Sequence, residues 1–225
     1  MNRTTQITQT EYSVFQAAYD FFNAELFSGT LPAVLITLQR HSKAYGFLAP
    51  KKFIGRSEET ATHELALNPD HFGRTDEAIL STLVHEMCHA WQVAHGAPPR
   101  KSYHDREWAA KMKEVGLFPS STGEPGGKET GPKVSHYVVE GGPFAQAFAR
   151  LKGAGFELRW QSRANDGERQ KKAESKSKYT CPNCEQNAWA KPGASLICGA
   201  CYEENGAISA MERITTSKGD KAKAA

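Results

Sequence analysis

The chain has 225 residues, of which 39% are hydrophobic and 24% are charged, and this ordinary globular composition excludes a collagen-like or wholly disordered protein. The length allows one well-packed domain and a smaller module. The formal net charge of +3 is unevenly distributed: residues 1–162 are neutral, 163–178 carry +3, 179–211 carry −2 and 212–225 carry +2. Any electrostatic attraction to nucleic acid should therefore come mainly from the segments on either side of 179–211.

The chain shows no signal for a membrane or for secretion. It has no apolar run long enough to span a bilayer, and its first residues lack the apolar segment and the cleavage site of a secretory signal. We therefore expect a cytoplasmic protein with no membrane partner. A reducing compartment also suits the cysteines, because four of the five form two C-x-x-C pairs, which favours metal binding over disulfides.

The N-terminal part predicts a helix followed by a small sheet. Large apolar residues recur at three- and four-residue steps over residues 10–27, which predicts an amphipathic helix. Three short apolar or β-branched runs follow, separated by clusters of Pro, Lys, Gly and Ser, and they predict strands. These runs cover residues 33–38, 44–49 and 63–68.

Two further helices are predicted in the middle of the chain. Thr75, followed by two acidic residues, can cap a helix that should continue to Gly96, and two prolines beyond that glycine prevent its extension. A second helix over residues 104–116 should place His104 and Trp108 on one face.

The remaining segments complete a mixed domain and a separate module. Residues 117–135 are rich in Gly, Ser, Thr and Pro and predict a long loop, after which a strand (136–139), a helix (143–151) and a last strand (156–160) follow. We therefore predict an α+β domain and three C-terminal segments. The expected boundaries are 1–160 for the domain, 161–178 for a flexible basic linker, 179–211 for a four-cysteine zinc ribbon and 212–225 for a disordered tail.

His85, Glu86 and His89 form the pattern H-E-x-x-H inside the first of the two middle helices. Residues four apart lie one turn above each other, so both imidazoles can reach one ion with Glu86 beside it. There Glu86 can take a proton from water and return it to a leaving amine. Zinc suits this chemistry because it lowers the pKa of a bound water towards about 7 and polarises a carbonyl. The alternative for so short a pattern is a buried helix whose histidines are satisfied by hydrogen bonds.

A catalytic zinc ion needs a third protein ligand. His95 has the spacing of the H-E-x-x-H-x-x-G-x-x-H class, but Gln92 replaces the glycine that would end the helix, so His95 is predicted to be a surface or helix-end residue. His104 is the preferred third ligand, because the chain turns after Gly96 and can bring it back to the ion. The alternative for His104 is a residue that faces solvent, and Glu107 is then the substitute ligand.

The cysteines near the C-terminus predict a second, structural zinc site. The spacing C-x2-C-x13-C-x2-C is typical of two knuckles that complete a closed tetrahedron of thiolates. Its members are Cys181, Cys184, Cys198 and Cys201. A module this small should not fold without the ion. Tyr179, Trp189 and Tyr202 could stack on bases, but the −2 charge of residues 179–211 repels phosphates, so we interpret these aromatics as core residues.

Several other residues carry weaker signals. The stretch STGEPGGKETG fails the phosphate-binding pattern G-x-x-x-x-G-K-[ST] and is interpreted as a flexible loop. His136 and Tyr137 could hydrogen-bond a developing oxyanion, or they are ordinary strand residues. Cys88 is predicted to be a small core residue, and His63 a strand residue, because leucine stands where a second histidine of the motif would be.

The residues now described resemble a known family. The run LVHEMCHAWQ, the histidine of HDREW and the strand HELALNP are similar to the SprT-like family of zinc metalloproteases, to which the eukaryotic protease Spartan belongs. The resemblance covers roughly residues 12–115 and, through the cysteine pairs, the C-terminal module. It implies a zincin-like fold and zinc-dependent proteolysis, which in Spartan acts on proteins crosslinked to DNA. The implied roles are His85, His89 and His104 as ligands of one catalytic zinc ion and Glu86 as catalytic base.

The sequence therefore predicts a metallopeptidase with one catalytic and one structural zinc ion. Its substrates would be proteins, with DNA-associated or DNA-crosslinked proteins as candidates, and DNA is a candidate partner through the linker and the ribbon. An edge strand near HELALN could align the substrate. The alternative is a nonenzymatic adaptor that binds nucleic acid or protein through the ribbon and the linker. Glu86 favours the enzyme, because a purely structural site needs no base.

Overall fold

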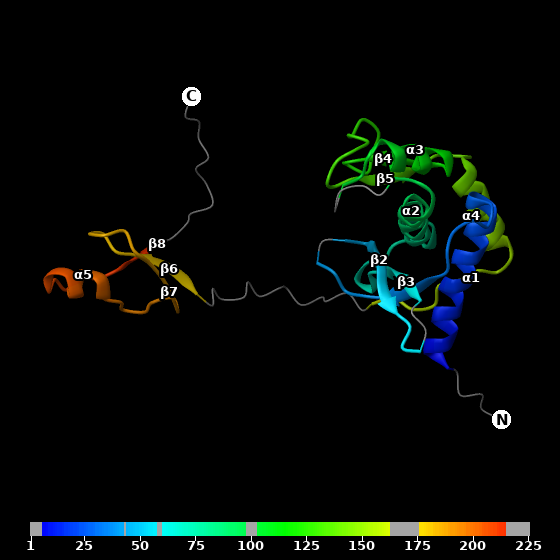
Figure 1. The fold of residues 1–225 in the computed structure, drawn as a ribbon. Coiled ribbons are helices and arrows are strands. Elements are labelled where there is room, and N and C mark those ends of the chain that lie inside the picture. Colours follow the sequence, from blue (N-terminus) through cyan, green and yellow to red (C-terminus); the bar gives the residue numbers. More distant parts are fainter. Residues whose placement is uncertain (1–5, 43, 58–59, 98–102, 163–175, 215–225) are drawn as a thin grey trace. The chain divides into compact units, whose positions relative to one another are not determined.

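The computed structural model describes residues 6–42, 44–57, 60–97, 103–162 and 176–214. The chain divides into two compact units, residues 1–164 and 165–225, and each has its own buried cluster. Figure 1 follows the elements of both units in sequence colours. Among the described residues, no helix combines the length and the apolar character that a membrane crossing requires.

The predicted N-terminal helix is confirmed as α1 (Ile7–Phe27). Its apolar face is buried, and Phe22 stacks on Phe144 of α4 (Pro143–Gly153), also a predicted helix, with ring centroids 5.5 Å apart. Burying one such aromatic side chain contributes about 1.5–3 kcal/mol to stability. The two helices lie side by side in Figure 1 and form one wall of the core.

The three predicted strands form one sheet in the order β1-β3-β2. The strands are β1 (Val34–Leu38), β2 (Gly46–Ile54) and β3 (Ala61–Leu67). The central strand β3 pairs with β1 in parallel and with β2 in antiparallel orientation. Because HELAL lies within β3 and is paired on both sides, it is not itself an edge. Within the described residues, β2 is an edge strand of this sheet, and it packs against α2.

The helix α2 (Asp76–His95) starts and ends as its sequence predicts. The hydroxyl of Thr75 accepts a hydrogen bond from the backbone N–H of Ala78, and the helix stops at Gly96. A short 3-10 helix, η1 (Pro69–His71), connects β3 to it. α2 packs against β2 and β3 and also contacts α1 and α3, so it lies at the centre of the unit (Figure 1).

The helix α3 (Arg106–Glu114) begins later than predicted. Asp105 caps it by accepting a hydrogen bond from the backbone N–H of Trp108, which leaves His104 outside the helix. The prediction that His104 lies on a helical face is therefore wrong. His104 instead forms an isolated β-bridge with Gly131, and both backbone N–H to O=C bonds of that bridge are 2.9 Å long.

The stretch predicted as a long loop begins with a strand. β4 (Leu117–Ser120) pairs with β5 (Ser135–Val138), the strand that was predicted, and the two form a separate two-stranded sheet. Pro119 lies in β4, where it is tolerated because each strand of a pair has one side without a partner strand. Backbone bonds such as Ser121 N–H to Lys128 O (2.8 Å) give residues 121–134 a defined path rather than that of the flexible loop expected.

The last predicted strand of the first unit is absent. Residues 156–160 form no strand, and Phe156 and Leu158 pack against the core as partly buried side chains. The alternating apolar pattern there reflects packing of an irregular segment, because the structure places no strand beside it among the described residues.

The second unit contains a three-stranded sheet and a short helix. The sheet has the strand order β7-β6-β8 and consists of β6 (Ser177–Thr180), β7 (Asn187–Ala190) and β8 (Glu212–Ile214). In the sequence, α5 (Gly199–Asn205) follows β7 and precedes β8. β6 begins within the range predicted as linker and β8 lies within the range predicted as tail. Residues 163–175 and 215–225 of these two ranges lie outside the described residues.

The aromatic residues of the ribbon differ from the expectation. Tyr179 is buried as predicted, and its hydroxyl donates to the carbonyl of Lys191 at 2.9 Å. Trp189 and Tyr202 are 64% and 59% exposed, so the prediction that they belong to the core is wrong. The described buried cluster of this unit consists of Cys181, Cys198 and Cys201, with Met211 packed against it.

Candidate metal centres

Three histidines come together at the centre of the first unit. His85 and His89 lie one turn apart on α2, and the bridge with Gly131 brings His104 next to them. Each ring offers one nitrogen atom to a metal ion, and these three nitrogen atoms lie within 4.8 Å of one another. Two nitrogens on one zinc ion are at most about 4.2 Å apart, so small ring rotations suffice for one ion to contact all three. The indole of Trp108 supports the three rings, with centroid distances of 4.8, 5.1 and 4.4 Å.

The three imidazoles are neutral at pH 7. Burial lowers the pKa of His85 well below its usual value, lowers that of His89 to about 3, and lowers that of His104 despite its bond to the Gly131 carbonyl. A neutral imidazole keeps one nitrogen lone pair free, which is the form that binds a metal ion. The donor set therefore fits zinc, and its burial removes the competition from protons near neutral pH.

His104 is oriented by the backbone of the 121–134 segment. Its Nδ1 lies 3.1 Å from the carbonyl oxygen of Gly131, to which a ring N–H at that position donates. The proton on Nδ1 leaves Nε2 as the ligand atom. Gly131 has φ of 142°, a conformation that side-chain-bearing residues rarely adopt, so glycine is required where the chain meets His104.

Gln92, which stands where a glycine would end the helix in a related class, links α2 to α3. Its Nε2 donates to Asp105 Oδ1 at 2.8 Å and to Glu107 Oε2 at 2.9 Å. Glu107 also accepts from the backbone N–H of Ala97 at 2.9 Å. The substitute ligand Glu107 is thus engaged in this link and lies outside the histidine cluster. The link holds Asp105, and with it His104, against α2.

Replacing Gln92 by leucine should lower the free energy of unfolding by about 1.5–3 kcal/mol, because two hydrogen bonds to carboxylates are lost at a buried position. Urea denaturation followed by tryptophan fluorescence measures the change. The matched control is Gln16→Leu, which removes one exposed bond to Asp20 and should change stability by less than about 0.5 kcal/mol. Equal effects of the two changes would contradict the role of the link.

Glu86 lies beside the histidines and is 5% exposed. Burial raises its pKa to about 8, although the backbone N–H of Leu48 donates to it and lowers the pKa in part. A cation held by the histidines would lower this pKa further, because a nearby positive charge favours the carboxylate. Gly46 allows this close packing of β2 on α2, since a Cβ there would lie 2.9 Å from the Ala66 carbonyl oxygen and 3.2 Å from Glu86 Cγ.

The histidines and Glu86 open into one cleft of about 780 Å³. One wall is the start of the edge strand β2 with the residues just before it, 44–50, and the other is formed by residues 132–136. His85, His89, His104 and Glu86 lie between these walls. A chain segment that entered the cleft would therefore meet a strand edge and the histidine cluster together.

The remaining candidates of the first unit are also placed. His136 lines the cleft, whereas Tyr137 points away from it and stacks on Phe118. His95 ends α2 as an exposed residue, as predicted, and its Nε2 lies 2.9 Å from the Thr30 carbonyl. Cys88 is fully buried in the core, and His63 lies on β3, where its Nδ1 accepts from the backbone N–H of Lys51; both predictions are confirmed.

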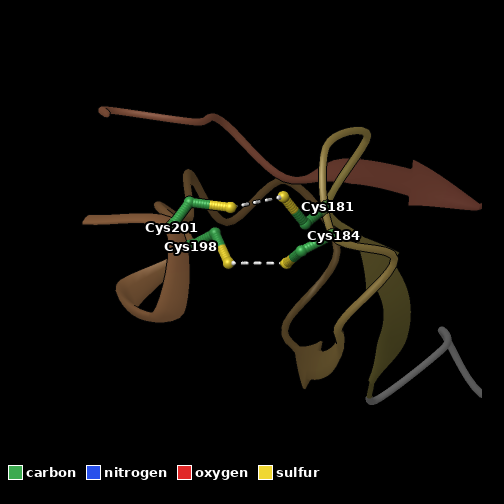
Figure 2. A group of neighbouring side chains, drawn as sticks. All are labelled: Cys181, Cys184, Cys198 and Cys201. Atoms are coloured by element: carbon green, nitrogen blue, oxygen red, sulfur yellow. Dashed lines mark hydrogen bonds between the residues drawn. The ribbon is translucent and has the colours of Figure 1, made fainter. Parts of the chain in front are cut away.

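The four cysteines of the second unit form the other cluster. All four sulfurs lie within 4.8 Å of one another, and Figure 2 shows them converging, Cys181 and Cys184 from one side and Cys198 and Cys201 from the start of α5. The Cys181–Cys201 and Cys184–Cys198 sulfur pairs are 3.7 and 3.5 Å apart, far longer than a disulfide. A hydrogen bond from the Ser209 hydroxyl lowers the pKa of Cys181, whereas hydrogen bonding with Cys184 raises the pKa of Cys201. The cluster fits a closed, structural zinc site.

The fold and the two clusters define a mixed α+β protein with two candidate metal centres. The chain belongs to the SprT-like family, whose model matches residues 15–127, and this family is generally of the metallopeptidase type. A relative from Salmonella typhimurium, described as an uncharacterized protein in the mucB 3' region, is 47% identical over 58 residues, which is 26% of this chain and 78% of the relative. No solved structure matches the chain significantly.

Proposed function

We propose that this protein is a zinc-dependent metallopeptidase with a zincin-like catalytic domain, and that it hydrolyses protein substrates. The observation that supports the proposal best is the presence of three neutral histidines and Glu86 within a single cleft. A site of purely structural metal would be closed and would not need a buried carboxyl group beside the ligands.

Each residue of the site has a distinct task in this reaction. Zinc, when held by His85, His89 and His104, would polarise the scissile carbonyl and make water more acidic. Glu86 accepts the proton of the attacking water and later delivers it to the leaving amine. The N–H of Leu48 and the close packing allowed by Gly46 keep the Glu86 carboxyl group in place during both transfers.

The edge strand β2 is suited to binding the substrate backbone. Residues 46–50 line the cleft, and within the described residues β2 has no second partner strand. An extended peptide can add to such an edge through main-chain hydrogen bonds, which recognise a polypeptide without demanding a particular sequence. We place the substrate along β2, next to the predicted strand HELAL.

Contact with DNA is the second part of the proposal. The exposed rings of Trp189 and Tyr202 can stack on unpaired bases, and the positive charge of residues 163–178 can contact phosphates. Substrates bound or crosslinked to DNA would then be brought to the protease by the ribbon and the linker. The same exposed rings also favour the alternative, a nonenzymatic adaptor that binds nucleic acid or protein.

Digestion of an unfolded protein distinguishes the enzyme from the adaptor. The purified full chain should cleave a denatured substrate, lose this activity with a zinc chelator, and regain it when zinc is restored. An adaptor would show no cleavage under any of these conditions, so inactivity of the zinc-loaded protein would contradict the proposal. DNA affinity is tested separately: it should fall steeply with salt and be lost on deletion of residues 162–225.

A further inference from the structure

We propose that His136 is a positioning residue that fixes the tautomer and the orientation of His85, so that Nε2 of His85 is the atom offered to the metal. This inference rests on the proposed metal site. His136 comes from β5, 51 positions away in the chain from His85, and the two Nδ1 atoms lie 3.1 Å apart. The other nitrogen of His136, Nε2, lies 3.0 Å from the hydroxyl of Ser81.

The direction of the hydrogen bonds follows from Ser81. We assign the hydroxyl proton to the bond with the carbonyl of Ala78 at 3.1 Å, which leaves the hydroxyl oxygen to accept from His136. His136 must therefore carry its proton on Nε2, and its Nδ1 becomes an acceptor. That acceptor faces Nδ1 of His85, which must in turn carry a proton. The lone pair of His85 is then on Nε2.

The two neighbours of His136 define this arrangement. His136 is flanked by His85 and Ser81, and Arg74 is the charged residue that acts on it. A neutral imidazole holds a single ring proton, and His136 uses it at Nε2 toward Ser81, so its Nδ1 keeps a free lone pair. With one proton per ring, the chain of hydrogen bonds has one consistent direction.

The same logic operates at a second ligand, which strengthens the inference. His104 uses its Nδ1 proton to bond the carbonyl of Gly131, and so also presents Nε2. A metal-binding histidine usually donates its other ring N–H to such an acceptor. His136 supplies that acceptor for His85. Both of its nitrogens are engaged in doing so, which disfavours the alternative that it donates to an oxyanion of the substrate.

Zinc affinity measured by competition with a chromophoric chelator tests the inference, with the four-cysteine site of the same chain as internal reference. His136→Ala should weaken binding at the histidine site by about 10–100-fold and leave the cysteine site unchanged. His136→Asn should restore most of the affinity, because its side-chain oxygen can occupy the place of Nδ1. Tyr137→Ala is the matched control on the same strand and should bind zinc as the wild type does.

Nitrogen NMR of the zinc-loaded chain measures which ring nitrogen of His85 carries the proton, a property that would not depend on His136 if its role were only structural. His85 should show a protonated Nδ1, with a scalar coupling across the hydrogen bond to Nδ1 of His136. A protonated Nε2 on His85, or unchanged zinc affinity in His136→Ala, would overturn the inference even if peptidase activity is present. Absence of any zinc at the histidine site of the wild type would overturn the proposed function as well.

Discussion

Replacing Glu86 by glutamine should reduce peptidase activity by about 10²–10⁴-fold, the range expected when a general acid–base group is lost. Glutamine has nearly the same shape and can still accept from the N–H of Leu48, so β2 should stay packed on α2. It cannot accept a proton from water at neutral pH. The loss should therefore appear in the catalytic rate, while the zinc content stays as in the wild type.

The comparison uses cleavage of a denatured protein by zinc-loaded samples of equal metal content. Glu77→Gln is a matched control, because Glu77 lies in the first turn of the same helix, before His85, and outside the cleft lining. It should keep the wild-type rate. Full activity of Glu86→Gln would show that another group moves the proton and would remove Glu86 from the mechanism.

Loss of one ribbon cysteine should unfold the second unit and leave the first intact. The described buried apolar cluster of this unit consists of three cysteines with Met211 packed against them, which is too little apolar surface to offset the conformational entropy of folding. The metal must supply the difference, and structural zinc sites provide about 10–16 kcal/mol of apparent binding free energy. We therefore expect Cys198→Ser to bind one zinc ion fewer.

Two-dimensional NMR of the backbone amides measures this effect residue by residue. In Cys198→Ser, the resonances of residues 177–214 should collapse to random-coil positions, whereas those of the first unit should not move. Cys88→Ala is the matched control, because Cys88 is buried in the core of the first unit, away from the other cysteines. Dispersed ribbon resonances in the metal-free variant would contradict a structural role for zinc there.

Local sequence signals predicted the elements of the site well. The helix that carries His85 and His89 has a capping threonine, an apolar face and a terminating glycine, all of which lie within one short stretch. The two C-x-x-C pairs likewise fix the composition of the cysteine cluster by their spacing alone. Such features are predictable because every residue that determines them is close in sequence.

Features that depend on distant contacts could not be predicted in the same way. His104 was placed on a helix, but Asp105 caps that helix after it, and the orientation of His104 comes from Gly131, 27 positions later. The bond between His136 and His85 spans 51 positions, and the sequence offered no sign of it beyond a polar residue in a predicted strand. The wrong strand at 156–160 has the same origin, because alternation predicts a half-buried segment but not a partner strand.

The composition of the ribbon core shows a further limit. Aromatic residues in a short module were assigned to its interior, yet Trp189 and Tyr202 are exposed. Tyr179 and three of the four cysteines are buried in this unit, whereas Trp189 and Tyr202 lie at its surface. The sequence of so small a module therefore does not show which of its aromatic rings are buried.

Metal analysis of the wild type and of His104→Ala tests the central claim most directly. The wild type should contain about two zinc ions per chain and His104→Ala about one, because the histidine site loses a ligand while the cysteine site is untouched. His95→Ala, which removes an exposed histidine from the end of the same helix that carries His85 and His89, should keep both ions. Two ions retained in His104→Ala, or one ion in the wild type, would contradict a metal centre shared by His85, His89 and His104.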